Sequence, residues 1–560
     1  MRSLLGCLLL ATVLAPGMPA RAQEADEPST EAFFETVDVN LVNVEVVVTD
    51  RSGNPVLDLE KEDFEILEDG RPVAITNFYA LRGERRAAAV RPGLEIPAGE
   101  GEAGSGPYAA DDPAQRLYLI VYVDNFNIMP FHRNRVFRRV REFLRNAVGP
   151  GDKVMLVSYN RTLKTRVSFT SDPAVVSREL FEIEEETGYN VHRESERREV
   201  LRDIEESNDY FTPLTRARTY AESYHSDVQF TIDALRDLIA TLGGLPGRKA
   251  ILHVSDGLPQ VPGEDLFQAI QEKYQQSSIL SESRQYDTSR RFDQLAQVAN
   301  GNRVSFYMID AAGLRTPSSA SVTTAHAGIN AAIDSTFIHN LQAPLLRLSE
   351  QTGGRAIINS NDVKDDLARV QQDFESYYSL GYASAHGGTG RYHDLEVRVK
   401  GDKSYRVLHR AGYRDKPLQQ RMNDSTMAAL VFGEETNQLG LRLRVGEPVR
   451  RDEGRHFTVP ITVEIPLGSV TMVPLGDAYE ARVQLFLAAL DSDGGTSEVQ
   501  SLRIPIRVPK EEIERARTQS WTYEVPLLMR SGQHRLAVGI HDDLAGEESF
   551  VTRSFVVGRS

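Results

Sequence analysis

The segment Leu117–Pro130, LYLIVYVDNFNIMP, decides how the chain folds. Its first seven residues are all apolar or aromatic, and the run ends abruptly in Asp124. A short, continuous apolar run is typical of a strand that is buried on both faces, as strands in parallel sheets are. A carboxylate at the tip of such a strand lies where open α/β sheets bind ligands. The segment therefore predicts a buried parallel strand whose end presents an acidic group.

Similar strands recur along the chain and alternate with helical patterns. They are KVMLVSY (153–159), KAILHVSD (249–256), RVSFYMID (303–310) and RAIIN (355–359). This alternation is typical of a doubly wound α/β domain with a mostly parallel sheet covered by helices on both faces. We place that domain at 115–376, with a charged helical insertion at 181–214. Because the carboxyl ends of parallel strands meet at one edge, Asp124, Asp256 and Asp310 are expected to gather there.

The segments on either side of the α/β domain have a period of two, which is typical of strands. Residues 33–82 are predicted as an N-terminal β segment with a hairpin on Asp69-Gly70, and 377–415 as a β-hairpin, over 395–410, that completes the same β-domain. The segment 83–114 is rich in Gly, Ala and Pro and is predicted as a linker. Residues 425–560 alternate in short runs, which predicts an all-β sandwich.

The first 22 residues have the pattern of a secretory signal peptide. A short positive start is followed by an apolar stretch and by Ala20-Arg21-Ala22, with cleavage expected before Gln23. Leu4-Leu5-Gly6-Cys7 is similar to a lipoprotein box, but it precedes most of the apolar stretch, which disfavours lipidation. We therefore expect an exported protein, periplasmic or extracellular. Cleavage would remove Cys7, the single cysteine, so disulfides and thiol chemistry are not expected.

Composition limits the classes of partner. The chain of 560 residues has a formal net charge of -16, which is not the footprint of a nucleic-acid-binding protein. Outside the leader, no apolar run approaches the roughly 20 residues that span a bilayer. We therefore expect no nucleic acid and no transmembrane segment, and we expect a protein partner whose identity the sequence does not give.

The quoted strands, with GRKAILHVSDG (247–257) and RVSFYMIDAAGL (303–314), resemble the von Willebrand factor A-type domain. The flanks are also similar to those of bacterial exported VWFA-related proteins. On one side is VTDRSGNPVLDLEKEDFEILEDGRPVAITNF (48–78), and on the other is SYYSLGYAS (376–384). The resemblance implies a Rossmann-like α/β domain that binds a protein partner at the carboxyl ends of its strands.

The same resemblance implies a metal-ion-dependent adhesion site for Mg²⁺ or Mn²⁺. Its pattern is D-x-S-x-S after the first strand, a Thr from a second loop and an Asp after the fourth strand. Asp124 and Asp256 match the first and last positions, whereas the two serine positions hold Phe126 and Ile128. A degenerate site would then use Asp124, Asn127 and Asp256, with Thr187 as the candidate threonine and water completing the shell. The alternative is structural, with the aspartates, including Asp310, accepting N–H bonds from their loops.

Three functions stay open at this point. The first is a non-enzymatic protein-binding or adhesion module of the bacterial cell envelope that uses this strand-end face. The second is a metal-independent structural scaffold, whose β-domains bind instead. The third is a metal-dependent hydrolase, which the sequence disfavours because no base, nucleophile or complete metal shell is visible.

Three further features have ordinary structural explanations in the sequence. His253 lies inside an apolar strand and is predicted to be a core histidine with satisfied hydrogen bonds. Arginines of the helix at 132–148 are predicted to lie on a solvated face, with docking to an anionic partner as the alternative. The insertion is expected to protrude near the site edge, either as a partner-recognition element or as a solvated lid.

Overall fold

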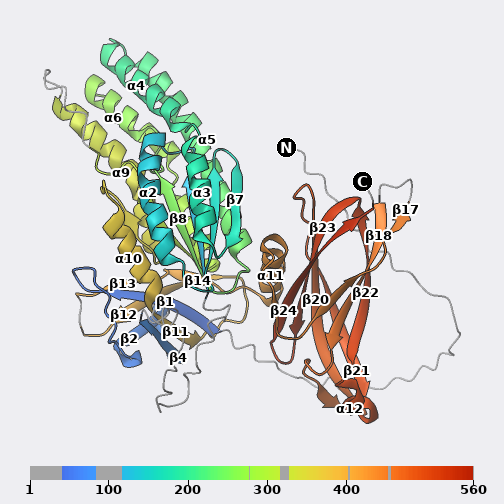
Figure 1. Ribbon diagram of the computed structural model, residues 1–560. Helices are drawn as coiled ribbons and strands as arrows, with labels where there is room; N and C mark the ends of the chain where they lie inside the picture. Colours follow the sequence, from blue (N-terminus) through green and yellow to red (C-terminus); the bar gives the residue numbers. More distant parts are fainter. Residues whose placement is uncertain are drawn as a thin grey trace. The chain divides into compact units, whose positions relative to one another are not determined.

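The computed structural model describes residues 41–82, 116–276, 278–315, 327–401, 404–451 and 456–558. The signal peptide predicted at 1–22, the linker predicted at 83–114 and part of the loop after Asp310 lie outside these ranges. The chain divides into two compact units, Asn40–Lys416 and the unit that contains Pro417–Ser560. Among the described residues, no helix combines the length and the apolar character needed to cross a membrane. The chain is a mixed α/β protein with several sheets, as predicted (Figure 1).

Segments from both ends of the first unit form a β-domain of two sheets. One sheet has the order β13-β1-β11-β4 and the other β14-β12-β2-β3. Val44, Val46, Ile66 and Leu380 are fully buried between them, because alternate residues of a strand face the same side. The strands are β1 (Leu41–Thr49), β2 (Phe64–Glu68), β3 (Arg71–Val73), β4 (Asn77–Arg82), β11 (Ser376–Ala383), β12 (Tyr392–Val399), β13 (Arg406–Leu408) and β14 (Gly412–Arg414), with the short helix η1 (Lys61–Asp63) before β2.

The hairpin predicted over 395–410 is wrong, although both of its strands form. β12 pairs with β2 and β14, whereas β13 pairs with β1 in the opposite sheet. The chain therefore crosses between sheets after β12. The hairpin on Asp69-Gly70 does form, since β2 and β3 pair directly across these two residues, which both have positive φ.

The α/β domain is built on a sheet with the order β10-β9-β8-β5-β6-β7. Its strands are parallel except β7, which runs antiparallel to β6. Every residue of β5 is buried, so helices must cover both faces of the sheet. The strands are β5 (Leu117–Asp124), β6 (Lys153–Tyr159), β7 (Leu163–Thr170), β8 (Arg248–Ser255), β9 (Val304–Asp310) and β10 (Ala356–Ile357).

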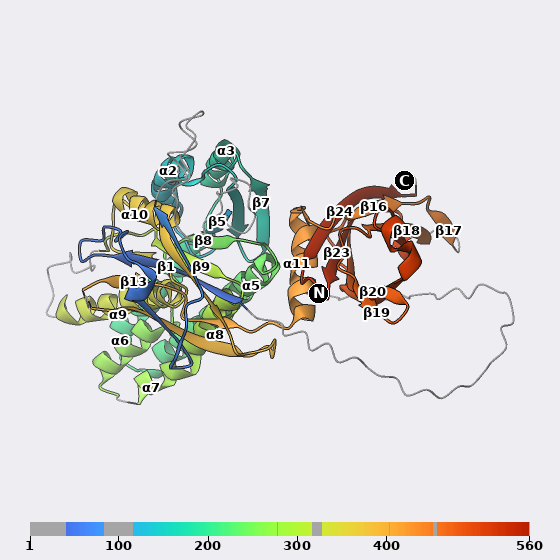
Figure 2. The same cartoon turned by 90° about the horizontal axis from the view of Figure 1, so that it is seen from below.

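The helices lie in two layers, one on each face of this sheet (Figure 2). Leu119, Val121 and Val123 face the layer of α2 (Pro130–Ala147), α3 (Pro173–Glu184) and α10 (Lys364–Glu375). The other helices of the domain are α4 (Asn190–Glu206), α5 (Phe211–Leu242), α6 (Glu264–Tyr274), α7 (Ile279–Ser283), η3 (Arg284–Tyr286), α8 (Ser289–Gly301) and α9 (Ala327–Gln351).

The predicted insertion at 181–214 contains one complete helix, α4, which packs against α5 and α6. Figure 1 shows α4 beside α5 and α6, where these helices extend past the end of the sheet. Arg193 and Arg197 of α4 are each only 5% exposed. Arg193 Nη2 lies 2.5 Å from Asp227 Oδ2 of α5, and Arg197 Nε lies 2.7 Å from Asp265 Oδ2 of α6. Buried charges stay charged only when they are paired, so these ion pairs fix α4 against its neighbours.

The second unit is a β-sandwich preceded by a helix that the sequence analysis did not predict, α11 (Leu418–Phe432). One sheet has the order β15-β24-β23-β20-β19 with β21 beside β20, and the other has β16-β18-β17 with β22 beside β18. Inward-facing apolar residues such as Val459, Val483 and Val538 form its core. The elements are β15 (Thr436–Asn437), β16 (Arg442–Val445), β17 (Val449–Arg451), β18 (His456–Pro466), β19 (Val473–Leu475), β20 (Ala478–Asp491), β21 (Gln500–Pro509), η5 (Lys510–Glu512), α12 (Ile513–Ala516), β22 (Ser520–Arg530), β23 (Gly532–Asp542) and β24 (Glu548–Val557).

Candidate functional site

The three predicted aspartates lie at the carboxyl ends of neighbouring strands. Asp124 ends β5, Asp256 follows β8 and Asp310 ends β9, and these strands are adjacent in the sheet. The register places Ser255 beside Asp310. All three aspartates are at least 95% buried. This edge of the sheet therefore contains three acidic residues, but their carboxylates are buried and do not project into solvent.

Asp124 is bonded to the amide groups of its own loop. Its Oδ1 accepts hydrogen bonds from Asn127 N and Nδ2, both at 3.1 Å, and its Oδ2 accepts one from Asn127 Nδ2 at 2.9 Å. Burial raises the pKa of Asp124 to about 7, although the hydrogen bonds from Asn127 act to lower it. Asn127 thus serves as a donor to Asp124, and this pair closes the loop after β5.

His253 of β8 lies beneath this pair and differs from its prediction. Its ring stacks on Tyr122 with centroids 5.0 Å apart, and Nε2 is 3.8 Å from Asp124 Oδ2. Both ring nitrogens are buried without a hydrogen-bond partner, so the histidine is not satisfied. Burial lowers the pKa of His253 to about 3, which makes the imidazole neutral at physiological pH. A buried nitrogen without a hydrogen bond costs free energy of folding, so His253 is expected to lower the stability of the folded protein.

Asp256 is bonded to the start of α2. Its Oδ2 accepts hydrogen bonds from Met129 N at 2.8 Å and lies 2.9 Å from His132 Nδ1. Its backbone N–H donates to Asn127 O at 3.0 Å, which links the two predicted site loops. Asp256 Oδ1 is buried without a partner. The sequence analysis missed His132, because its partner Asp256 lies 124 residues further along the chain.

The residues at the two serine positions belong to the core. Ile128 packs among the helices on one face of the sheet. Phe126 is 1% exposed and stacks on Tyr189 with ring centroids 4.6 Å apart. Thr187 lies in the segment that passes beside this loop, where Asn125 Nδ2 donates to Glu186 Oε2 at 3.1 Å, but the Thr187 side chain is exposed. The structure therefore does not assign Thr187 to a shell around Asp124.

These contacts do not fit a Mg²⁺ or Mn²⁺ ion. Such ions need several oxygen ligands in octahedral geometry, usually with carboxylates free to coordinate. Here both oxygens of Asp124 face the amide donors of Asn127, and one oxygen of Asp256 faces a backbone N–H and His132. The positions that would add hydroxyl ligands hold a phenylalanine and an isoleucine. Hydrogen-bond donors thus face both oxygens of Asp124 and one oxygen of Asp256, and Asp256 Oδ1 is the oxygen left without a partner.

Asp310 accepts loop hydrogen bonds, in agreement with the structural alternative. Its Oδ1 accepts from Ala312 N at 3.1 Å and from Arg315 Nη2 at 3.0 Å. Gln342 Nε2 of α9 donates to Oδ2 at 2.8 Å. Arg315 Nη2 also donates to the backbone carbonyl of Asp256. A guanidinium therefore lies between the ends of β8 and β9 and supplies positive charge at this edge.

The pair of Asp256 and His132 is the closest approach to a catalytic arrangement at the edge. A histidine held by a carboxylate is a suitable general base when it can reach a nucleophile. Within the described part of the chain, His132 has its hydrogen bond to Asp256, and no hydroxyl group is bonded to it. The arrangement orients the ring without forming a triad.

Two exposed apolar side chains lie at the same edge. Phe131 follows the β5 loop and is 76% exposed, and Leu314 follows β9 and is 58% exposed. Arg135 of α2 connects their segments, because its Nη2 donates to Ala311 O at 2.7 Å and Ala312 O at 3.0 Å. We name Phe131, His132, Leu314 and Arg315 the strand-end face. It combines apolar groups with basic ones on a backbone that buried aspartates hold in place.

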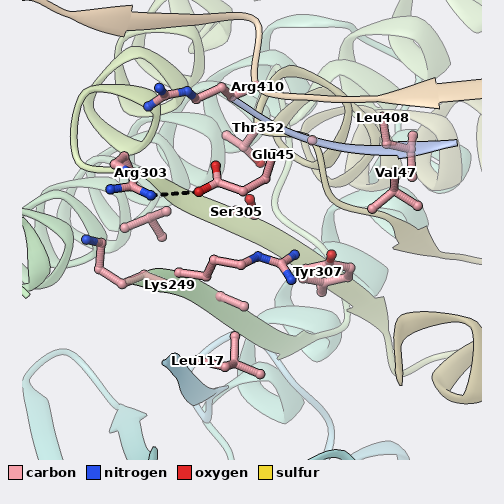
Figure 3. Close-up of a pocket in the computed structure, with 14 residues that line it drawn as sticks. Glu45, Val47, Leu117, Lys249, Arg303, Ser305, Tyr307, Thr352, Leu408 and Arg410 are labelled. Atoms are coloured by element: carbon pink, nitrogen blue, oxygen red, sulfur yellow. Dashed lines mark hydrogen bonds and ion pairs between the residues drawn. The ribbon is translucent and has the colours of Figure 1, made fainter. Parts of the chain in front are cut away.

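A basic pocket at the opposite end of the sheet is a second candidate. Arg248, Lys249 and Arg303 come from the starts of β8 and β9, and Arg410 and Glu45 come from the β-domain (Figure 3). Arg303 Nη2 donates to Glu45 Oε1 at 2.7 Å, which is the dashed contact in Figure 3.

The other cations in this pocket are also engaged. Arg410 donates to Asn43 O at 2.8 Å and Lys249 to Leu245 O at 2.7 Å. The Arg248 guanidinium lies 3.9 Å from the centroid of the Tyr377 ring. The contacts of Arg303 with Glu45 and of Arg248 with Tyr377 join the α/β domain to the β-domain, so the pocket serves as a junction.

Comparison with known proteins assigns no family. No protein family model matches the chain, and no curated protein matches it. Among solved structures, an aerotolerance-related membrane protein from Bacteroides fragilis is 11% identical with a TM-score of 0.23, and the match covers 46% of this chain and 98% of that one. BatB from Bacteroides thetaiotaomicron is 10% identical with a TM-score of 0.22, covering 46% and 96%. The pilus adhesin SpaC from Lactobacillus rhamnosus GG is 9% identical with a TM-score of 0.24, covering 80% and 53%. At these TM-scores the matches do not bear on function, which is inferred below from the chain's own contacts.

Proposed function

We propose that this protein is a non-enzymatic protein-binding module of the bacterial cell envelope, and that its partner docks on the strand-end face. The proposal takes the α/β domain to be of the von Willebrand factor A type, as its sequence resemblance implies, with a degenerate adhesion site. The observation that carries it is Phe131, which is 76% exposed directly after the loop that holds Asp124. A large exposed aromatic side chain in the first turn of a packed helix suits the central contact of a protein interface.

The composition of the face favours a protein partner. Phe131 and Leu314 supply apolar contacts, and His132 and Arg315 supply donors beside them. Protein interfaces are enriched in aromatic residues and arginine at their centres and carry polar groups around them. Asp124, Asp256 and Asp310 beneath the face are buried and each accepts hydrogen bonds, so binding would require little ordering of the loops.

The same contacts support the further part of the proposal, that binding does not need a metal ion. In the adhesion site that the resemblance implies, a metal ion bridges the aspartates and a carboxylate of the partner. Here Asn127 and His132 donate to the aspartates, and Arg315 bonds Asp310. Fixed hydrogen-bond donors of the protein therefore stand where the ion would bind, and the partner contacts the apolar and basic groups directly.

Site-specific photo-crosslinking tests the proposal in bacteria that make the protein. A photoreactive phenylalanine analogue replaces Phe131 in one variant and Leu346 of α9 in a matched control, since Leu346 is also exposed, at 44%. We expect irradiation to give one discrete protein adduct from position 131 and none from position 346. Mass spectrometry of that adduct identifies the partner.

Two results would contradict the proposal. The first is the absence of any protein adduct at position 131, and the second is the same set of adducts at both positions. Adducts formed only by a probe in the C-terminal sandwich, such as one at the exposed Val556, would favour the scaffold alternative, in which the β-domains bind.

A further inference from the structure

Three potential metal ligands converge at one end of the β-domain, away from the strand-end face. They are Asp69, in the turn between β2 and β3, His386, in the connection from β11 to β12, and His393, on β12. One ligand atom from each lies within 4.8 Å of the others. The residues are far apart in sequence, and the pairing of β12 with β2 brings them together.

The potential ligand atoms lie near the spacing of a metal site, although the stacked imidazole rings must tilt before both can direct a nitrogen at one ion. Asp69 Oδ2 lies 2.8 Å from His393 Nδ1 and 4.0 Å from His386 Nε2. In a tetrahedral shell with bonds of 2.0–2.2 Å, neighbouring ligand atoms lie roughly 3.4 Å apart. The two imidazole rings stack with centroids 3.9 Å apart.

His393 also has a nitrogen without a partner. The residue is 5% exposed, and its Nε2 is buried without a hydrogen bond. A buried polar atom of this kind costs free energy unless a ligand satisfies it. Asp69 lies at the other nitrogen, Nδ1, so a shell that includes Asp69 takes His393 through Nδ1 in place of this hydrogen bond.

The protein holds the ligands in place. Asp69 lies in its turn with a positive φ of 50°. Asp394 N donates to Asp69 Oδ1 at 2.9 Å and so holds the carboxylate in place. The loop of His386 is anchored by the buried Asp415, whose carboxylate accepts from Gly388 N at 2.9 Å and from Thr389 N at 2.7 Å.

A second carboxylate lies beside the cluster. Glu68 Oε1 accepts hydrogen bonds from the hydroxyls of Tyr382 and Tyr413 at 2.8 and 2.6 Å. Its other oxygen, Oε2, lies 3.6 Å from His386 Nε2. The position of Glu68 is thus fixed by its bonded oxygen, and the free oxygen faces the cluster.

We propose that Asp69, His386 and His393 bind a divalent transition-metal ion of the Zn²⁺ class, with Glu68 Oε2 or water as the fourth ligand. Two imidazoles and one or two carboxylates are a common ligand set for Zn²⁺, and the two carboxylates balance the charge of the ion. Mg²⁺ and Ca²⁺ prefer oxygen ligands, so the pair of histidines excludes them. The site would connect β2, β12 and the loop before β12.

Calorimetric titration of the full chain with Zn²⁺ tests the proposal, with the protein free of any histidine tag. Asp69→Asn and His386→Gln are the test variants, because Asn tolerates the left-handed turn and His386 is partly exposed. His456→Gln, an exposed histidine on β18, is the matched control. We expect one saturable site in the wild type and the control, with affinity about 10- to 100-fold weaker in both test variants.

Co²⁺ absorption provides a second readout that does not depend on stability. We expect the visible bands of a tetrahedral site in the wild type and the control and their loss in His386→Gln. Equal Zn²⁺ affinity in all four proteins would overturn the proposal, and so would a wild type without saturable binding. Circular dichroism of each variant verifies that the fold is retained.

Discussion

Asp124 combines complete burial with hydrogen bonds from amide groups, and this explains the raised pKa of its carboxyl group. Burial disfavours the charged form more strongly than the three contacts with Asn127 favour it. The folded protein therefore holds a proton on this carboxyl group up to about pH 7. Asp124 matches a metal-ligand position in the sequence. In the structure its carboxyl group accepts hydrogen bonds from its own loop.

This proton uptake predicts a pH dependence of stability. An aspartate in the unfolded chain loses its proton near pH 4, roughly three units below the folded pKa. The stabilising contribution is therefore complete below about pH 4 and is lost as the pH rises through about 7. Asp124→Asn has no such proton. We expect the unfolding free energy of the wild type, relative to the variant, to fall by up to about 4 kcal/mol over this interval.

Urea unfolding at a series of pH values measures the difference. The helical circular dichroism signal follows the first unit, where most of the helices lie. Asp237→Asn, at an exposed position of α5, is the control and should track the wild type. A stability difference between wild type and Asp124→Asn that stays constant with pH would contradict the argument.

Mg²⁺ titration tests the contacts around the aspartates. Because Asn127 and His132 occupy the oxygens that an ion would need, we expect no saturable heat in the wild type or in Asp124→Ala. Mg²⁺ is the suitable probe because the histidine-containing cluster binds it poorly. Saturable heat in the wild type that disappears in Asp124→Ala would restore the metal-dependent adhesion site.

The positions of some site residues can be predicted from the sequence, but the residues to which they are hydrogen-bonded cannot. Strand ends follow from apolar runs, so the positions of Asp124 and Asp256 at one edge could be predicted. His132 and Arg133 could not, because their partners come from other segments. Arg133, predicted on a solvated helix face, is buried and donates to Asn125 Oδ1 and to the carbonyl of Glu186 at 2.9 Å. Periodicity identifies the apolar face of a helix. It does not show which polar residue of that helix is covered by a neighbouring loop.

At the scale of elements, the junction between the β-domain and the α/β domain rests on Glu45 of β1. Burial acts to raise the pKa of Glu45, but Arg303, Arg410 and Arg248 outweigh it and lower the pKa to about 2. The contribution of this carboxylate to stability is present above about pH 4 and is lost as the pH falls through about 2. Glu45 is the single acidic residue among the described residues that line the pocket.

Glu45→Gln is therefore expected to destabilise the first unit. The substitution removes the charge that pairs with Arg303, which is a charge-assisted hydrogen bond, so the expected loss is about 1–3 kcal/mol in unfolding free energy at neutral pH. Urea unfolding measures it, with Glu62→Gln at an exposed position of the same β-domain as control. Equal stability of Glu45→Gln and the wild type would show that the junction does not depend on this ion pair.

Element predictions failed where pairing is decided by distant segments. Both strands of the predicted 395–410 hairpin form, but β12 pairs with β2 and β13 with β1. Alternation specifies that a segment is a strand and which face is buried, but not which strand it pairs with. The mixed charge of α4 indicated solvation, and only its neighbours α5 and α6 show that Arg193 and Arg197 are paired with buried aspartates.

At the scale of the whole molecule, the α/β domain lies within a β-domain formed by the segments before and after it. β11 pairs with both β1 and β4, so the chain returns to the same sheet after the α/β domain, which makes up more than half of the first unit. This arrangement fixes the amino ends of the parallel strands at the basic junction. It leaves their carboxyl ends, with Phe131 and Leu314, as the exposed end of the domain.

The affinity of the crosslinked partner for purified variants tests the central claim most directly. Surface plasmon resonance would compare the wild type with Phe131→Ala on the strand-end face and with Val556→Ala on the C-terminal sandwich, both exposed positions. We predict at least about tenfold weaker binding for Phe131→Ala, as for a central interface residue, and unchanged binding for Val556→Ala. Unchanged affinity in Phe131→Ala would contradict a binding role for the strand-end face, and a loss in Val556→Ala alone would assign binding to the sandwich.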